Sequence, residues 1–440
     1  MSVPNVIGSL NRNQRNAFTA SFLGWTLDAF DFFLVTLVTT EVAKEFKVGI
    51  PAILLTTTLT LAMRPLGALI FGLLAERFGR RTPLMIDILL YSFLELLTAF
   101  SPNYTTFLIL RVLFGIGMGG EWGLGSSLAM ESLPTRSRGF FSGVLQQGYA
   151  FGYLLAALAY GLLFPLIGWR GLFIVGAVPA LLVVYIRMSV TESEVWVQRK
   201  AALRELGIGM WGSIGNAIKS HWLLFIYVIV LMTSFNSLSH GTQDNLPTFL
   251  KAQLHFSPGL ASTLTIISNV GAIIGGTLFG AWSQSWGRRR AIIVAACLGI
   301  LMIPLWTGLV RVPVVSLAAS IAIGAFLLQF MVQGAWGVIP AHLNELSPTD
   351  VRGTFPGFAY QLGNLFASWV VFIEGVVANN LGSEKLPNYQ LALAYFSLGA
   401  FIAVIVFTAI GREAREMDFL QADKQQEIEE SGEGREAFQA

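Results

Sequence analysis

Charge and cysteine are both scarce in this sequence. Asp, Glu, Lys and Arg make up 12% of the 440 residues, against roughly a quarter in a soluble protein, so water is not the main solvent of the fold. Cys297 is the only cysteine, which excludes an intrachain disulfide and a zinc site built on several thiolates, and we expect its side chain to be buried. A formal net charge of +2 gives no reason to expect nucleic-acid binding.

The chain consists largely of long apolar segments. Hydrophobic residues make up 54% of the chain, and its mean hydropathy is +0.64. A helix needs about 20 mostly apolar residues to cross a bilayer, and the chain offers such runs almost from end to end. We predict an all-α membrane protein whose transmembrane helices span residues 17–39, 51–74, 83–101, 106–129, 139–165, 171–190, 221–249, 258–282, 290–310, 313–340, 353–379 and 388–410.

The loops between these runs predict the orientation in the membrane. Lys and Arg gather at the N-terminus, in every second loop and in the C-terminal tail, whereas the opposite side has few, such as Lys44 and Arg170. The positive-inside rule then places both termini in the cytoplasm. We expect a multi-pass protein of the plasma (inner) membrane.

Two loops repeat along the chain. GLLAERFGRR at residues 72–81 returns in weaker form as GAWSQSWGRR at residues 280–289, and Glu131 in a later loop is matched by Glu345. Internal symmetry of this kind is typical of transporters that work by alternating access. We therefore predict two pseudo-symmetric six-helix bundles, divided as follows: bundle 1–190, cytoplasmic linker loop 191–220, bundle 221–411 and cytoplasmic tail 412–440.

The first of these loops resembles the hallmark of the major facilitator superfamily, G-x-x-x-[DE]-R-x-G-R-[RK], which residues 72–81 meet in full. Arg111, followed by glycines in the fourth span, is also similar to that family. The resemblance implies the major facilitator fold and a transporter that is not an enzyme. Charge pairs in the loop should hold the cytoplasmic helix ends together, through Glu76, Arg77, Arg80 and Arg81.

Ionisable side chains inside the spans are unexpectedly many. Each costs about 2.5 to 3.5 kcal/mol on insertion scales, so each needs a partner, a wet cavity or a function. Carboxyl and imidazole groups in such places can load and release protons. The ionisable residues are Asp28, Asp31, Arg64, Asp87, Glu95, Arg111, Glu121, His240, Asp244, His342 and Glu374.

The seventh span has the densest polar run, NSLSHGTQDNLPT at residues 236–248. Helical spacing brings Asn236, Ser239, His240, Gln243, Asp244 and Thr248 near one face, and a stripe of this density belongs against a cavity. Pro247 should break or kink the helix.

This run resembles the signature of Jen-type lactate/pyruvate proton symporters, N-x-x-[ST]-H-x-[ST]-Q-D-x-x-x-T, at every fixed position. The first span, GWTLDAFDFF at residues 24–33, is similar to the wider sialate:proton symporter group. The resemblance implies proton-coupled uptake of short monocarboxylates such as L-lactate or pyruvate. It implies substrate binding by Arg64, Asn236, His240, Gln243 and Asn364, and proton coupling by Asp244, His240, Asp28 and Asp31.

Several roles stay open at this point. Arg64 needs an anion, which is either a substrate carboxylate or a permanent partner aspartate. Arg111 could neutralise Asp28 or Asp31, which makes Asp31 a rival proton site. We expect Glu121 and Glu374 to be gating or packing contacts.

Other functions fit the same residues. The same scheme could carry sialic acid or an aromatic acid, and a transporter-like nutrient sensor is an alternative of another class. We find no nucleophile with an oriented base, no metal set and no P-loop pattern, so we expect no enzyme activity, cofactor or direct ATP drive. The expected partners are a small organic anion, a proton and the lipid bilayer, and we expect the protein to function as a monomer.

Overall fold

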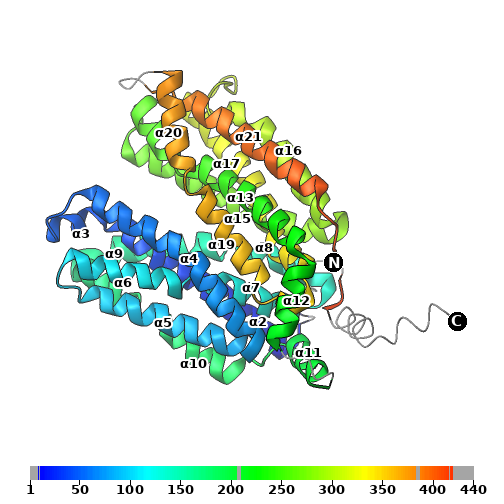
Figure 1. Ribbon diagram of the computed structural model, residues 1–440. Coiled ribbons are helices and arrows are strands. Elements are labelled where there is room, and N and C mark those ends of the chain that lie inside the picture. The colour runs from blue at the N-terminus through cyan, green and yellow to red at the C-terminus, as the bar shows by residue number, and fades with distance from the viewer. Residues whose placement is uncertain (1–7, 9, 206–209, 383–386, 416, 420–440) are drawn as a thin grey trace.

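The computed structural model describes residues 8, 10–205, 210–382, 387–415 and 417–419, and within them the chain forms helices and no strand. Figure 1 shows two groups of helices side by side, the earlier (blue to cyan) below and the later (green to red) above. Eleven helical segments of the described chain are long and apolar enough to cross a membrane, and one shorter apolar helix accompanies them. The predicted all-α membrane fold is confirmed.

The first helix group follows the predicted spans with interruptions. The fourth crossing is divided after Gly117, and the fifth begins with a short helix before the long one. The helices of this group are α2 (Arg12–Leu37), α3 (Thr39–Glu45), α4 (Ile50–Phe78), α5 (Arg81–Ala99), α6 (Tyr104–Gly117), α7 (Glu121–Ser132), η1 (Thr135–Ser137), α8 (Arg138–Gln146), α9 (Gly148–Val175) and α10 (Ala180–Ser189).

A single glycine separates the fifth and sixth crossings. Within α9, Gly168 has φ 64° and ψ −176°, a backbone conformation that only glycine adopts readily. The fifth crossing therefore ends before Gly168, and the sixth consists of the remainder of α9 together with α10. This division agrees with the predicted spans 139–165 and 171–190.

The second helix group contains the predicted proline break. Helix α13 ends at Gln243, four residues before Pro247, and a short helix and a π-helical turn follow. The helices are α13 (Trp222–Gln243), α14 (Leu246–Thr248), η2 (Phe249–Gln253), α15 (Pro258–Trp286), α16 (Arg288–Trp306), α17 (Leu317–Trp336), α18 (Ile339–Leu346), η3 (Thr349–Val351), α19 (Phe355–Ala367), α20 (Val370–Leu381) and α21 (Tyr389–Ile410).

The segment between the groups differs from the prediction. The linker 191–220 was expected to be a loop, but it contains helices α11 (Glu194–Glu205) and α12 (Met210–Ser220). Its polar residues were interpreted as loop-forming, whereas strong helix formers such as Ala, Leu, Arg and Glu dominate α11. The division into bundles 1–190 and 221–411 stays a prediction, and most of the predicted tail, residues 420–440, lies outside the described residues.

The outer surface of both groups is apolar. Large hydrophobic side chains such as Leu158, Leu162 and Leu301 are exposed, as expected of faces that contact lipid. Cys297 is exposed as well, so the prediction that it is buried is wrong. The outward face of a membrane helix is as apolar as the core, and composition cannot tell the two apart.

The loop repeat is visible in the backbone. Gly79 ends α4 with φ 93°, and Gly287 ends α15 with φ 95°. Both values fall in the region that only glycine occupies without strain. The same tight turn therefore follows the second and the eighth crossing.

The arginine after each turn makes the same ion pair. Arg80 contacts Glu131 at 3.0 Å and Glu76 at 2.9 Å, and Arg288 contacts Glu345 at 2.9 Å. Burial alone would lower the pKa of the Arg80 guanidinium, but the two carboxylates beside it raise the pKa above its ordinary value. The predicted charge pair of the loop is thus present for Arg80.

A second carboxylate closes each turn. Glu192 accepts hydrogen bonds from the backbone N–H groups of Arg80 and Arg81, at 2.7 and 3.2 Å. Glu413 accepts from those of Arg288 and Arg289, at 3.1 Å each. Burial raises the pKa of Glu192, and these hydrogen bonds oppose the rise. Neither carboxylate was singled out from the sequence.

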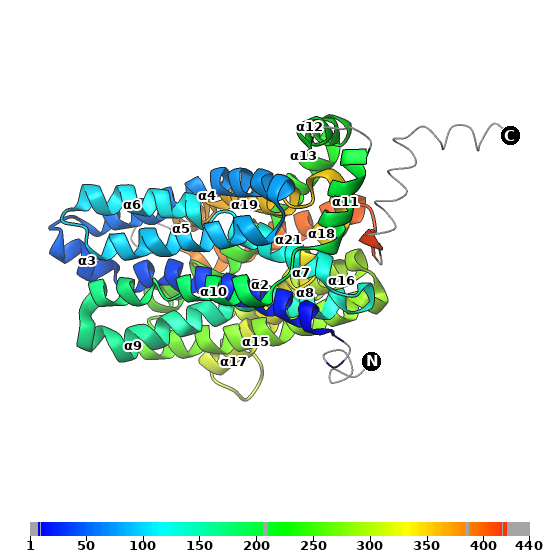
Figure 2. The same cartoon turned by 90° about the horizontal axis from the view of Figure 1, so that it is seen from below.

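The two helix groups are tied together at one end. Figure 2 shows α11 and α12 at this end and α3 at the other; we call them the α11 end and the α3 end. Glu76 accepts hydrogen bonds from the backbone of Gly353 at 2.6 Å and of Thr354 at 3.1 Å, and Ser127 donates to the carbonyl of Arg352 at 2.9 Å. Among the described residues, every hydrogen bond between the two groups lies on the α11 side of the cavity described below.

Two glycines allow the groups to touch without side chains. A Cβ atom added to Gly357 in α19 would lie 2.7 Å from the Cα of Gly123 in α7. No larger residue fits this contact without a shift of the backbone. The α11 end is therefore closed by direct backbone packing as well as by hydrogen bonds.

The C-terminal segment, residues 411–415 and 417–419, crosses from the second group to the first. The ring of Phe419 is 1% exposed and lies between two guanidinium groups, 3.7 Å from Arg138 and 4.2 Å from Arg352. Arg138 also donates to the carbonyl of Met417 at 2.6 Å. The segment thus adds a further contact across the α11 end.

Candidate functional site

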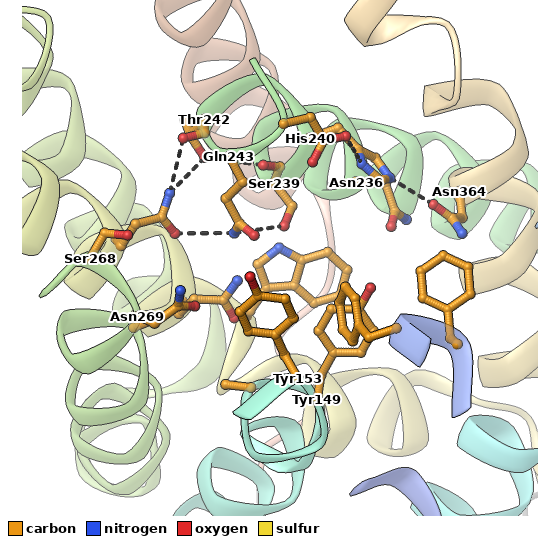
Figure 3. A pocket seen from close by; sticks show the side chains of 18 of the residues that line it. Tyr149, Tyr153, Asn236, Ser239, His240, Thr242, Gln243, Ser268, Asn269 and Asn364 are labelled. Carbon is orange, nitrogen blue, oxygen red and sulfur yellow. Dashed lines mark hydrogen bonds and ion pairs between the residues drawn. The ribbon is translucent and has the colours of Figure 1, made fainter. Parts of the chain in front are cut away.

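A cavity of about 470 Å³ lies between the two helix groups. It is lined from the first group by α2, α4, α8 and α9, and from the second by α13, α14, α15, α17 and α19. Its size falls within the range of pockets that bind drug-sized ligands. Figure 3 shows how polar side chains and aromatic rings meet in it.

The polar stripe of α13 faces this cavity, as predicted. Asn236, Ser239, His240, Gln243 and Asp244 all line it, whereas Thr248 does not. The stripe turns inward because the opposite face of α13 carries the apolar side chains of the core.

His240 is held by a hydrogen bond at each ring nitrogen. Nδ1 lies 2.8 Å from the carboxylate of Asp244, and Nε2 lies 2.9 Å from Oδ1 of Asn364. A ring nitrogen must donate to an amide oxygen, so Nε2 carries a proton. One further proton is shared between Nδ1 and Asp244, and the pair can give it up or take it back as a unit.

The remaining amides of the stripe bond within the second group. Asn236 donates to the carbonyl of Met232 at 2.8 Å. Gln243 donates to Ser239 at 3.2 Å and to Gln329 at 3.1 Å. Asn236 and Gln243, two of the predicted substrate-binding residues, are thus held by neighbouring groups while still lining the cavity.

Arg64 is the one fixed cation of the cavity wall. Its side chain is 3% exposed and pairs with the fully buried carboxylate of Asp28 at 3.0 Å. The guanidinium also lies 5.5 Å from the ring centroid of Phe32. The sequence leaves two possible partners for Arg64, a substrate carboxylate or a permanent aspartate. The structure shows the aspartate, Asp28, and Arg64 also lines the cavity, where a substrate anion could approach it.

More carboxyl groups are buried behind this wall. Asp31 and Glu121 have side-chain oxygens that no described hydrogen-bond donor reaches, and Asp87 is buried beside them. Arg111 pairs with Glu95, and not with Asp28 or Asp31 as the sequence had suggested. Five buried carboxyl groups within the spans of the first group, Asp28, Asp31, Asp87, Glu95 and Glu121, thus face two buried arginines, Arg64 and Arg111. This excess is costly to bury unless some of the carboxyl groups hold protons.

The other predicted residues lie outside the cavity. Glu76 and Arg80 belong to the α11 end, and Arg81 donates to the carbonyl of Arg187. Arg77 is exposed and makes no ion pair among those described, so no predicted charge pair is seen for it. Glu374 is buried and accepts a hydrogen bond from Asn245 at 2.9 Å.

The sequence did not single out several lining residues. Polar side chains within apolar spans, such as Gln147, Asn269 and Gln329, carried a signal that could have been used. The aromatic rings gave none, since Phe, Tyr and Trp are common throughout a membrane protein. The lining residues not predicted include Tyr149, Tyr153, Ser268, Asn269, Gln329, Gln333, Trp336 and Tyr360.

Comparison with known proteins agrees with this geometry. The sequence model described as Major Facilitator Superfamily matches residues 18–371. The chain belongs to the major facilitator superfamily, a family of transporters and not of enzymes.

Individual relatives extend the comparison. The carboxylic acid transporter protein homolog of Saccharomyces cerevisiae is 30% identical over 90% of this chain and 68% of its own length. The sialic acid transporter NanX of Escherichia coli is 28% identical over 91% of this chain and 93% of its own. The solved proton:xylose symporter XylE superposes with a TM-score of 0.70 at 19% identity, over 94% of this chain and 99% of its own.

Proposed function

We propose that the protein imports a small organic acid together with a proton by alternating access, with short monocarboxylates such as L-lactate or pyruvate as substrates. The ion pair between Arg64 and Asp28 at the cavity wall carries this proposal. The yeast relative, a carboxylic acid transporter homolog, and the Escherichia coli relative, a sialic acid transporter, support an acid as cargo.

The pair couples the anion to the proton. Arg64 keeps its positive charge at any physiological pH, and in the empty site Asp28 balances it. When Asp28 takes a proton, the guanidinium loses its counter-charge and can form a bidentate contact with a substrate carboxylate. Because each ligand favours the other, proton and anion bind together.

His240 and Asp244 provide a second proton site on the opposite wall. The proton is shared on the Nδ1 side of the imidazole, and Asn364 contacts the other ring nitrogen, where its amide also lines the cavity and can meet a substrate oxygen. Asp28 belongs to the first helix group and the His240–Asp244 pair to the second, so a substrate bound between them responds to both. Asp31 is the less direct candidate, because the ion pair described for Arg64 is made by Asp28.

The closed α11 end defines the state of the carrier. If the α11 end is cytoplasmic, as the positive loops predict, the described state has its inner side sealed. Loading of the site would then precede rearrangement of the contacts around Glu76 and Gly357. A single copy of the chain encloses the whole cavity, which supports a monomer as the working unit.

A second candidate cargo is an aromatic acid or sialic acid. The specific observation in its favour is the cavity itself, which at about 470 Å³ is large for a three-carbon acid and has aromatic walls. The mechanism of coupling would be the same.

Uptake into proteoliposomes tests the proposal. Labelled lactate should accumulate under an imposed inward pH gradient, and a protonophore should abolish the accumulation. Excess unlabelled lactate, benzoate or sialic acid would rank the cargoes by competition. Arg64→Gln should lower uptake by at least about thirtyfold, since loss of a buried charged partner costs about 2 kcal/mol or more.

A matched variant controls for the loss of an arginine. Arg170 pairs with Glu45 at the partly exposed α3 end, far from the cavity lining, and Arg170→Gln should keep most of the activity. Undiminished accumulation of every tested acid by Arg64→Gln would overturn the proposed function.

A further inference from the structure

One side of the cavity carries a group of polar side chains that the proposed function does not use. Figure 3 shows Ser268 and Asn269 on the side opposite Asn364, and Gln243 and Gln329 lie bonded to each other at 3.1 Å. We call this set the amide pole: Ser239, Thr242, Gln243, Ser268, Asn269 and Gln329, all of which line the cavity.

Hydrogen bonds already engage most of the donors of the amide pole. Gln329 donates to the hydroxyl of Thr242 at 3.1 Å and accepts from Gln243. Gln243 donates to Ser239, and Asn269 donates to the carbonyl of Thr265 at 2.9 Å. Among the described residues, no donor reaches Oε1 of Gln243 or Oδ1 of Asn269, so the pole presents acceptors to the cavity.

The amide pole is a poor binding site for an anion. None of the six members of the amide pole carries a charge, and the guanidinium of the cavity lining, Arg64, lies on α4 in the first helix group. A carboxylate placed against the amide pole would therefore meet acceptor oxygens and no guanidinium of the pole's own. A hydroxyl group would instead donate to a free acceptor.

Aromatic rings lie between the amide pole and Asn364. Tyr149 and Tyr153 lie between Asn269 and Asn364 in Figure 3. Tyr149 stacks on Trp25 with ring centroids 5.5 Å apart, and Trp336 packs edge-on to Tyr360 at 5.6 Å. Rings fixed by such contacts favour a planar ligand that stacks on them.

The amide pole belongs to a single helix group. Its members come from α13, α15 and α17, all in the second helix group, and their mutual hydrogen bonds do not cross to the first. Rearrangement between the groups can narrow the cavity without dismantling this pole.

We propose that the cavity selects planar, unsaturated or aromatic monocarboxylates that carry a hydroxyl group at the end remote from the carboxylate. This assignment rests on the proposed function, in which Arg64 takes the carboxylate. The hydroxyl donates to Gln243 or Asn269, and the carbon body stacks on the rings of Tyr149 and Tyr153. A three-carbon acid held at Arg64 does not reach the amide pole and binds more weakly.

Calorimetric binding to the purified protein tests this assignment with four acids: lactate, benzoate, 4-hydroxybenzoate and terephthalate. We expect 4-hydroxybenzoate to bind about fivefold to tenfold more tightly than benzoate, the value of one hydrogen bond. Terephthalate should bind more weakly than benzoate, because its second carboxylate meets no cation.

Two variants remove the free acceptors while keeping the size of the side chain. Gln243→Met and Asn269→Leu should each reduce the advantage of 4-hydroxybenzoate over benzoate, and the pair together should abolish it, with benzoate affinity little changed. Gln253→Met is the matched control, since Gln253 lies in the same helix group but outside the cavity lining. The control should keep the full preference.

The outcomes separate the two proposals. If benzoate and 4-hydroxybenzoate bind the wild type equally, or if both cavity variants weaken the two acids alike, the amide-pole assignment is wrong while acid transport stands. If none of the four acids binds, the proposed function falls and the assignment with it.

Discussion

Replacing Asp28 by asparagine should separate the anion from the proton. Asp28→Asn keeps the size of the side chain and removes the charge that balances Arg64. Both side chains are nearly inaccessible to solvent, at 3% and 0% exposure. Removal of one partner of such a buried pair costs about 3 to 5 kcal/mol, because the other charge is left uncompensated.

A substrate carboxylate can recover part of this cost. Hydrogen bonds to a charged group contribute about 1.5 to 3 kcal/mol, so an acid should bind Asp28→Asn about 10-fold to 150-fold more tightly than it binds the wild type at neutral pH. Tighter binding is the opposite of what a merely disrupted site would give.

Calorimetry across a range of pH, followed by transport assays, checks the reasoning. Anion binding to the wild type should strengthen as pH falls, because protonated Asp28 frees Arg64, whereas binding to Asp28→Asn should keep only the pH dependence that the His240–Asp244 pair contributes. The variant should exchange acid across the membrane but fail to accumulate it under a pH gradient. Glu374→Gln, a buried carboxyl group outside the cavity lining, should behave as the wild type.

One combination of results would refute coupling through Asp28. If Asp28→Asn binds the acid no more tightly than the wild type and still accumulates it with unchanged pH dependence, the Arg64–Asp28 pair is structural and the proton enters elsewhere.

Two further predictions concern other parts of the molecule. Asp244→Asn removes the carboxylate 2.8 Å from His240. The variant should lower gradient-driven accumulation about tenfold or more while counterflow exchange persists. Accumulation by this variant at the level of the wild type in proteoliposomes would contradict the second proton site. Phe419→Ala removes the ring between Arg138 and Arg352 and should cost about 1 to 2 kcal/mol, seen as a lower Tm in detergent. Phe419→Leu should cost less, and an unchanged Tm in both variants would show that the C-terminal segment does not hold the α11 end together.

Elements with a strong local signal were predictable from the sequence. The crossings follow from apolar length, and the turn at Gly79 and the break before Pro247 follow from residues with few allowed conformations. The face of α13 was predictable because helical spacing places Asn236, His240 and Gln243 on one side. Such features depend on neighbours along the chain.

The partners of the buried charges were not predictable in the same way. The sequence showed that Arg64 needed an anion, but its choice of Asp28 depends on how α2 and α4 pack. The sequence offers Asp28 or Asp31 as a partner for Arg111, and the structure pairs it with Glu95 from α5. Several helices carry carboxyl groups at similar depth, and periodicity within one helix does not select among them.

The aromatic and amide lining was missed for a related reason. Tyr149 and Gln329 occur in runs where most neighbours face lipid or core, so composition gives their type but not their direction. Only the packing of α9 and α17 around the cavity turns them toward it.

The pairing of Arg64 with Asp28 also bears on what powers the proposed cycle. The empty site is electrically balanced, and the addition of one proton and one monoanion leaves that balance unchanged. Membrane voltage, worth about 2.3 kcal/mol per elementary charge at 100 mV, would then neither help nor hinder either crossing. A cell that lost its voltage but kept an acidic exterior would continue to concentrate the acid, whereas one in an alkaline medium would stop.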